Sequence, residues 1–197
     1  MQPQTFIFIG RSGCGKGTQA QLLEKILREK NADMPVVHLE TGKLFREFIK
    51  GNTYTQELSR VIYEAGGLQP EFLTVHLWSD FFVENMNEKH HLIIDGTPRK
   101  LHEAKVLHSS FEFYRREKPQ IILLNVSRKW SEDRMLARKR VDDNKMDIEA
   151  RLNWFDTEVT PAIDFYRGNS FYDFHDIDGE RSIEEIHTDI VKKLGLG

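Results

Sequence analysis

Residues 10–19 read G-R-S-G-C-G-K-G-T-Q and form a glycine-rich loop of a kind that binds phosphate. Gly10 and Gly15 bracket four residues, and Lys16 follows at once. The glycines let the backbone turn tightly enough for its N–H groups to point at phosphate oxygens. Lys16 and the N-terminus of the helix expected to begin there add positive charge. The spacing therefore predicts a site for the phosphates of a nucleotide.

The residue after Lys16 departs from the usual form of this loop. Ser or Thr commonly follows the lysine and binds magnesium, whereas here Gly17 follows and Thr18 comes next. Asp95 ends the apolar segment H-L-I-I-D, so its carboxylate is expected at the edge of a sheet. We predict that Asp95 holds Mg²⁺ through water, because Gly17 supplies no ligand. The alternative role for Asp95 is to cap a helix.

Six arginines are expected on or near the same edge, and their charge suits phosphoryl transfer between two nucleotides. Guanidinium groups bind phosphate oxygens in pairs and stay charged. Such a transfer needs cations at both ends and in the middle. For each arginine the alternative is a place on a solvated helix face. The six are Arg46, Arg99, Arg134, Arg138, Arg140 and Arg151.

Apolar segments alternate with helical patterns along the chain, which predicts an α/β fold. The expected strands are 5–9, 36–39, 91–95, 120–126 and, more weakly, 171–177. The expected helices cover 16–30, a long stretch at 131–166 broken near 140–144, and 182–194. Near-continuous apolar strands between helices indicate a buried five-stranded parallel sheet in a three-layer α/β/α arrangement. The segment 41–73 is helical without a strand, and we expect it to form a small flap over the sheet edge.

Length and composition favour one ordinary globular domain over residues 1–197. The net charge is −3 and hydrophobic residues make up 39% of the chain, so no general nucleic-acid surface is expected. No apolar stretch reaches the roughly 18 residues of a membrane span, and no signal peptide is evident. The single cysteine excludes an internal disulfide and fits a reducing cytoplasm. The eight histidines show no zinc spacing.

Taken together, the motifs resemble those of the adenylate kinases, in the nucleoside monophosphate kinase family. They follow the family's order over nearly the entire chain. The matching pieces are G-x-x-x-x-G-K-G-T-Q at 10–19, T-G-x-L-x-R at 41–46, D-G-x-P-R at 95–99, R-x-D-D at 140–143, Arg151 and D-G at 178–179. The K-G-T form of the loop is the family's own.

The resemblance implies the reaction ATP + AMP ⇌ 2 ADP with magnesium, carried by positioning and charge neutralisation. It implies a core at 1–40, 74–137 and 143–197, an AMP-binding insertion at 41–73 and a vestigial lid at 138–142. The implied catalytic residues are Lys16, Arg99, Arg138, Arg140 and Arg151. The implied ATP-binding residues are Gly13, Cys14, Gly15, Lys16, Gly17, Thr18, Arg134 and Arg181. The implied AMP-binding residues are Thr41, Gly42, Arg46, Leu68, Gly96, Arg99, Glu103, Arg140 and Arg151.

Glu103 stands where the family usually has a glutamine that reads the acceptor base. An amide can donate to adenine N1 and accept from the N6 amino group, whereas a carboxylate only accepts. Guanine presents N1–H and N2–H₂ together, so Glu103 alone favours GMP. The motif set, including Thr41-Gly42, favours AMP, and we expect AMP with GMP as the alternative acceptor. Glu103 could also be a surface carboxylate, with water reading the base.

The family's lid is almost absent, because only Lys139 separates Arg138 from Arg140. A lid normally excludes water during transfer. We therefore expect ATP hydrolysis without acceptor to be faster than in relatives with a full lid, as measured by phosphate release. An equally low rate would contradict the prediction of an exposed site. A monomer is assumed, with Lys139 or a second subunit as alternatives for covering the site.

Three further features leave alternatives open. Lys43 replaces the usual aspartate of T-G-D, and we expect it to point to solvent rather than toward the acceptor phosphate. Cys14 is expected to be a small spacer, the alternative being a reactive thiol beside Lys16. Residues 144–147 spell N-K-x-D, the guanine signature of GTPases, and 176–179 spell D-x-x-G. A switch GTPase is a remote alternative, because those motifs occur in the wrong order.

Overall fold

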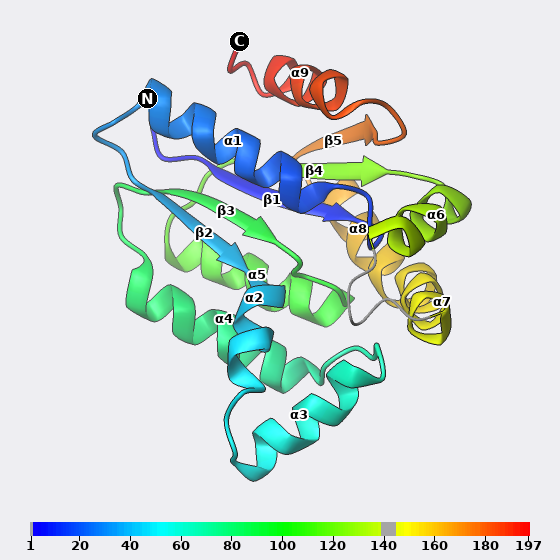
Figure 1. The fold of residues 1–197 in the computed structure, drawn as a ribbon. Coiled ribbons are helices and arrows are strands. Elements are labelled where there is room, and N and C mark those ends of the chain that lie inside the picture. The colour runs from blue at the N-terminus through cyan, green and yellow to red at the C-terminus, as the bar shows by residue number, and fades with distance from the viewer. Residues whose placement is uncertain (1, 139–144) are drawn as a thin grey trace.

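The computed structural model describes residues 2–138 and 145–197, and a parallel sheet lies between two layers of helices (Figure 1). The strand order is β2-β3-β1-β4-β5, and every pairing is parallel. This confirms the predicted α/β fold with a five-stranded parallel sheet. The strands are β1 (Thr5–Gly10), β2 (Val36–Glu40), β3 (His91–Asp95), β4 (Gln120–Asn125) and β5 (Asp173–Asp178).

The last strand begins two residues later than predicted, because a turn occupies the start of the predicted segment. The Asn169 side chain accepts a hydrogen bond from the Phe171 backbone N–H at 3.0 Å. Tyr172 then packs into the aromatic core against Tyr166, with the ring centroids 4.7 Å apart. Strand pairing with β4 therefore starts at Asp173.

The two faces of the sheet are covered by different helices, as the alternation of side chains along β1 requires. Phe6 and Phe8 pack with α1 (Lys16–Lys30) and α9 (Ile183–Lys193) on one face. Ile7 and Ile9 pack on the other face with α4 (Glu71–Asn85), α5 (Leu101–Phe113) and α8 (Thr160–Arg167). These two cores hold β1 rigidly, and the phosphate loop leaves its carboxyl end.

Helices α2 (Thr41–Phe48) and α3 (Tyr54–Glu64) lie beyond the carboxyl end of β2, within the segment predicted as the insertion (Figure 1). A capping box starts α3. The Thr53 hydroxyl accepts a hydrogen bond from the Gln56 backbone N–H, and Gln56 Oε1 accepts one from the Thr53 backbone N–H. The next helix, α4, begins inside that segment and continues against the sheet. The boundaries proposed for the insertion stay a prediction.

Helices α6 (Arg128–Arg138) and α7 (Lys145–Trp154) stand at the opposite end of the same sheet edge (Figure 1). A π-helical turn, η1 (Phe155–Val159), connects α7 to α8. The predicted lid, including Lys139, Arg140 and Asp142, lies outside the described residues, and only the backbone of Arg138 is described. Asp147 of the N-K-x-D sequence lies in α7 rather than after a strand, which argues against a GTPase-type base site.

Candidate active site

The glycines of the phosphate loop adopt conformations that other residues rarely adopt. Gly13 has φ +82° and Gly15 has φ +92°. A Cβ at Gly13 would lie 3.1 Å from Met135 Cγ, so α6 packs directly on the loop. Helix α1 begins at Lys16, immediately after this turn. The loop thus has the strand, the turn and the helix that phosphate binding requires.

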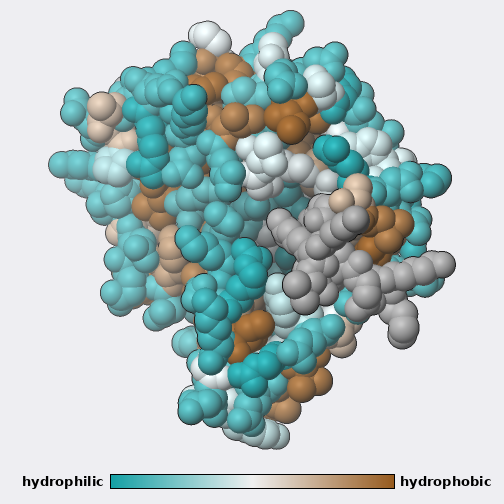
Figure 2. Space-filling model, in the orientation of Figure 1, coloured by the Kyte–Doolittle hydropathy of each residue, from teal (hydrophilic) through white to brown (hydrophobic). Residues whose placement is uncertain are grey.

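A cavity of about 670 Å³ lies where the carboxyl ends of the strands, the insertion helices and α6 and α7 meet. Hydrophilic side chains predominate on the face of the molecule shown in Figure 2. Among the described lining residues, five are cationic and three carry carboxylates: Lys16, Arg46, Arg99, Arg134 and Arg151, with Glu40, Asp95 and Glu103. Most of the predicted cations therefore converge in one crevice, which suits a polyanionic ligand.

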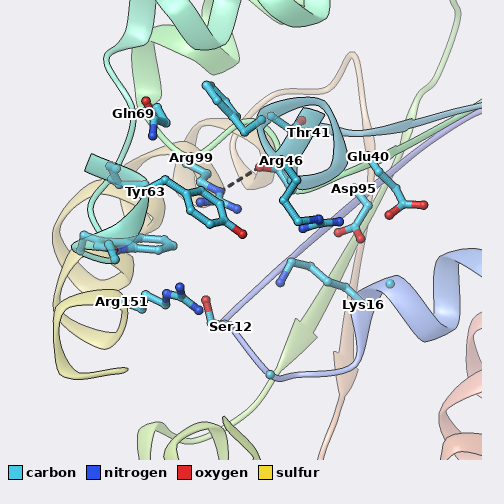
Figure 3. Close-up of a pocket in the computed structure, with 18 of the residues that line it drawn as sticks. Ser12, Lys16, Glu40, Thr41, Arg46, Tyr63, Gln69, Asp95, Arg99 and Arg151 are labelled. Carbon is cyan, nitrogen blue, oxygen red and sulfur yellow. Dashed lines mark hydrogen bonds between the residues drawn. The ribbon is translucent and has the colours of Figure 1, made fainter. Parts of the chain in front are cut away.

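Lys16 and Asp95 face each other at the phosphate loop (Figure 3). The Lys16 amine donates to the Arg11 carbonyl at 3.2 Å. Burial raises the pKa of Asp95, while the charge of Lys16 opposes that rise. Asp95 Oδ1 is buried, and no described residue hydrogen-bonds to it. A Cβ at Gly17 would lie 3.2 Å from Asp95 Oδ2, so a glycine after the lysine leaves room for this carboxylate.

Asp95 fits the role of magnesium partner that its place in the sequence predicts. Its unpartnered oxygen is a hard anionic donor beside the phosphate loop. The described residues contain no cluster of three or more His, Cys, Asp or Glu side chains that could hold a metal. A cation here would therefore rely on Asp95, water and the phosphates of a nucleotide, as Mg²⁺ commonly does.

Arg99 reaches the cavity from the loop after β3. Its Nε donates to the Gly96 carbonyl at 2.9 Å, the bond drawn in Figure 3. Its guanidinium lies over the Trp154 ring, 5.2 Å from the centroid. Burial lowers the pKa of Arg99, and Glu103 and Asp95 counteract that effect. Arginine keeps its charge under such a shift, so Arg99 presents a fixed cation.

The insertion side of the cavity carries the other residues predicted to bind the acceptor. Thr41, Gly42, Arg46 and Leu68 all line the cavity. Figure 3 shows Arg46 reaching toward Lys16 from α2. The hydroxyl of Thr41 is buried, and no described residue hydrogen-bonds to it, so it is a spare donor or acceptor for a ligand.

Glu103 lines the same cavity from the first turn of α5 and is 2% exposed. Its Oε2 accepts a hydrogen bond from the Arg99 backbone N–H at 2.7 Å. Burial raises the pKa of Glu103, and the Arg99 hydrogen bond and charge oppose that rise. Glu103 is therefore a buried carboxyl group at the cavity rather than a surface carboxylate.

Among the predicted site residues, the side chains of Cys14 and Arg181 do not line the cavity. Cys14 is 1% exposed and packs in the core beneath α1, as expected for a small spacer. Arg181 donates to Asp189 at 2.8 Å and to the Asp178 carbonyl at 3.2 Å. Lys43 is exposed and does not line the cavity, which matches its expected orientation toward solvent. The side chain of Arg138 and all of Arg140 lie outside the described part of the chain.

Several cavity residues were not selected from the sequence as site residues, and Tyr63, Gln69 and Trp154 are three of them. Tyr63 enters from the end of α3 and Gln69 from the following turn (Figure 3). Trp154, at the end of α7, lines the cavity and donates from Nε1 to the Gly66 carbonyl at 3.4 Å. The aromatic residues carry no spacing that distinguishes cavity walls from core, so only the fold locates them.

Comparisons with known proteins agree with this geometry. A family model described as "Adenylate kinase" matches residues 8–171. The chain is 31% identical to an adenylate kinase of Rickettsia bellii, over 96% of the chain and 98% of that protein. It is 32% identical to an adenylate kinase of Corynebacterium urealyticum, over 91% of the chain and 93% of that protein. An adenylate kinase of Leptospira biflexa is 31% identical, over 95% and 98%.

Proposed function

The chain belongs to the adenylate kinase family, and we propose that the cationic cavity carries out that family's reaction, ATP + AMP ⇌ 2 ADP. An oxygen of the AMP phosphate attacks the terminal phosphorus of ATP, and the bond to the bridging oxygen breaks. No covalent enzyme intermediate is needed. Catalysis then consists of aligning two anions and neutralising the charge between them.

Each cavity residue has a proposed role that follows from its position. The phosphate loop and Lys16 hold the donor phosphates, and Arg134 on α6 covers the donor base. Arg46 and Arg99 hold the acceptor phosphate, while Arg151 neutralises the phosphoryl group in transfer, with Arg138 and Arg140 in the same predicted role. Mg²⁺ beside Asp95 would neutralise the donor phosphates when bound. We also propose Thr41, Gly42, Leu68 and Gly96 as the walls of the acceptor site, since each lines the cavity.

The convergence of Lys16, Arg46, Arg99 and Arg151 in one cavity is the observation that carries this proposal (Figure 3). A coupled assay of AMP, GMP, CMP and UMP against ATP tests it. AMP should give the highest kcat/KM, and ATP consumption should depend on an acceptor. Equal ATP turnover without any monophosphate would contradict the proposal.

The environment of Glu103 supports AMP as the acceptor. Oε2 is held by the Arg99 backbone, and Oε1 has no hydrogen-bond partner among the described residues. An ionised carboxylate accepts from guanine N1–H and N2–H₂, but a protonated carboxyl can donate to adenine N1. Because burial raises the pKa of Glu103, the neutral form persists to higher pH than in an ordinary glutamate. In its protonated form, Glu103 can donate to adenine N1 as the amide of a glutamine does.

Replacing Glu103 with glutamine should raise the ratio of kcat/KM for AMP to that for GMP about tenfold at pH 8, since the amide donates at every pH. In the wild-type protein this ratio should fall as pH rises through the raised pKa of Glu103, because the ionised carboxylate can no longer donate to adenine N1. In Glu103→Gln the ratio should be flat with pH. A pH profile of both acceptors in both proteins is the measurement. Identical profiles would remove Glu103 from base recognition.

We also propose a cytoplasmic location. None of the helices in the described part of the chain is long and apolar enough to span a membrane. The chain has one cysteine, which is buried, so it has no disulfide that would require an oxidising compartment.

A further inference from the structure

Arg11, the second residue of the phosphate loop, connects the loop to η1 through contacts that have no role in the proposed reaction. Its Nη2 donates to Asp156 Oδ1 at 2.6 Å. Its guanidinium also lies over the Phe155 ring, 4.4 Å from the centroid. Phe155 and Asp156 begin the π-helical turn η1, directly after α7. Such turns often occur at functional sites.

The same carboxylate extends the contact to α6. Asp156 Oδ2 accepts from Arg128 Nη1 at 3.1 Å, and Arg128 Nη2 donates to Asn153 Oδ1 at 2.7 Å. The hydrogen bond from Arg11 is the main cause that lowers the pKa of Asp156, so this carboxylate stays ionised. Arg11, Asp156 and Arg128 therefore form a clamp that joins the phosphate loop, α6 and the end of α7.

The clamp lies one helical turn from a cationic residue of the cavity. Arg151 precedes Phe155 by four residues, so both side chains lie on similar faces of the helix. Figure 3 shows Arg151 and Ser12, the neighbour of Arg11, projecting into the same cavity. A shift of η1 relative to the loop would therefore move Arg151 relative to the phosphates.

Stability alone does not account for Arg11. Its Nη1 is buried without a hydrogen-bond partner among the described residues, which is costly for a charged group. Asp156 and Arg128 are 44% and 41% exposed, and pairs of that exposure contribute little stability. Removing Arg11 leaves no buried charge unpaired, because Asp156 remains in contact with Arg128 and with solvent.

We propose that Arg11 is a positioning residue that fixes Arg151 against the phosphate loop for phosphoryl transfer. This inference rests on the proposed function, because it assigns Arg151 to the transferring group. The clamp acts through Arg151 and does not touch the substrates, so it should affect the rate of transfer more than nucleotide affinity. A misplacement of about 1 Å can cost up to about a hundredfold in rate.

The test compares Arg11→Met with Arg167→Met in steady-state kinetics. Arg167 also pairs with a carboxylate, Asp164 at 3.2 Å, and lies over a ring, Phe174 at 4.9 Å, but not at the cavity. Arg11→Met should lower kcat about tenfold, with KM for ATP and AMP within about threefold and Tm within about 2 °C. Arg167→Met should leave kcat unchanged. Unchanged kcat in Arg11→Met would overturn the proposal.

A double variant separates positioning from a general structural role. If Arg11 acts through Arg151, then Arg11→Met should add little further loss of kcat to Arg151→Met. Losses that multiply would overturn the proposal. If Arg11→Met lowers Tm strongly, Asp156→Asn decides, since it keeps the shape and should still lower kcat, whereas full activity would contradict the clamp. A wild-type protein without AMP-dependent ADP formation would refute the proposed function itself.

Discussion

Replacing Lys16 with alanine is expected to lower kcat about a thousandfold with little loss of fold. Lys16 is the cation that the phosphate loop places beside Asp95 at the donor end of the cavity (Figure 3). Its charge compensates the negative charge that builds up as the phosphoryl group leaves its bridging oxygen. Arg46 and Arg99 enter from the acceptor side and cannot replace it at the loop.

The fold should survive this change because Lys16 contributes little to packing. Its amine makes one described hydrogen bond to a backbone oxygen, with the Arg11 carbonyl. The loss of such a bond costs about 1 kcal/mol. Steady-state kinetics, circular dichroism and thermal unfolding together measure the effect.

Lys25 provides the matched control for Lys16, since it lies on the same helix, α1. Its side chain is 73% exposed, and its contact with Glu29 is long, at 3.9 Å. Lys25→Ala should keep the wild-type kcat. If Lys16→Ala kept more than about a tenth of the wild-type kcat, the assignment of the loop to catalysis would be wrong.

The parts of this site that the sequence predicts are those whose chemistry depends on local spacing. The phosphate loop and Arg99 each directly follow a buried strand, so the strand itself fixes where they point. Near-continuous apolar strands separated by helical patterns were enough to place the sheet between two helical layers. Asp95 was predicted for the same reason, since a carboxylate at a strand end lies at the edge where ligands bind.

The rest of the site depends on contacts between distant segments, which no spacing records. Tyr63 and Trp154 belong to separate helices, and only the docking of α3 near α7 brings them to one cavity. Arg11 and Asp156 are 145 positions apart. Burial also depends on contacts between distant segments. The sequence identifies Glu103 as a carboxyl group, but it does not show that burial raises its pKa.

Cys14 shows that a position within a motif does not by itself place a side chain at the ligand. It lies within the phosphate loop, and its backbone follows the loop's path. Its side chain nevertheless turns into the core below α1 and is 1% exposed. A motif fixes the path of the backbone more reliably than the direction of each side chain.

Arg99→Lys should lower kcat/KM for AMP about a hundredfold even though the positive charge is kept. The Arg99 Nε is held by the Gly96 carbonyl at 2.9 Å, which leaves the two terminal nitrogens to face the cavity as a pair. The Trp154 ring under the guanidinium fixes the plane of that pair. A lysine ammonium can neither donate in this fixed pair nor stack on the ring in the same way. The acceptor phosphate would then lose its alignment more than its electrostatic attraction.

The effect should be selective for the acceptor, because we assign the acceptor phosphate to Arg99 and the donor phosphates to Lys16. KM for ATP should therefore change by less than about threefold. Arg116 supplies the matched control, since it is also buried and donates to two backbone carbonyls, of His90 at 2.7 Å and Asn87 at 3.1 Å. Arg116→Lys should lower Tm and leave kcat/KM for AMP unchanged. If Arg99→Lys instead weakened the binding of ATP and AMP equally, Arg99 would bind the transferring group rather than the acceptor. The proposed division of the cavity into a donor end and an acceptor end would then be wrong.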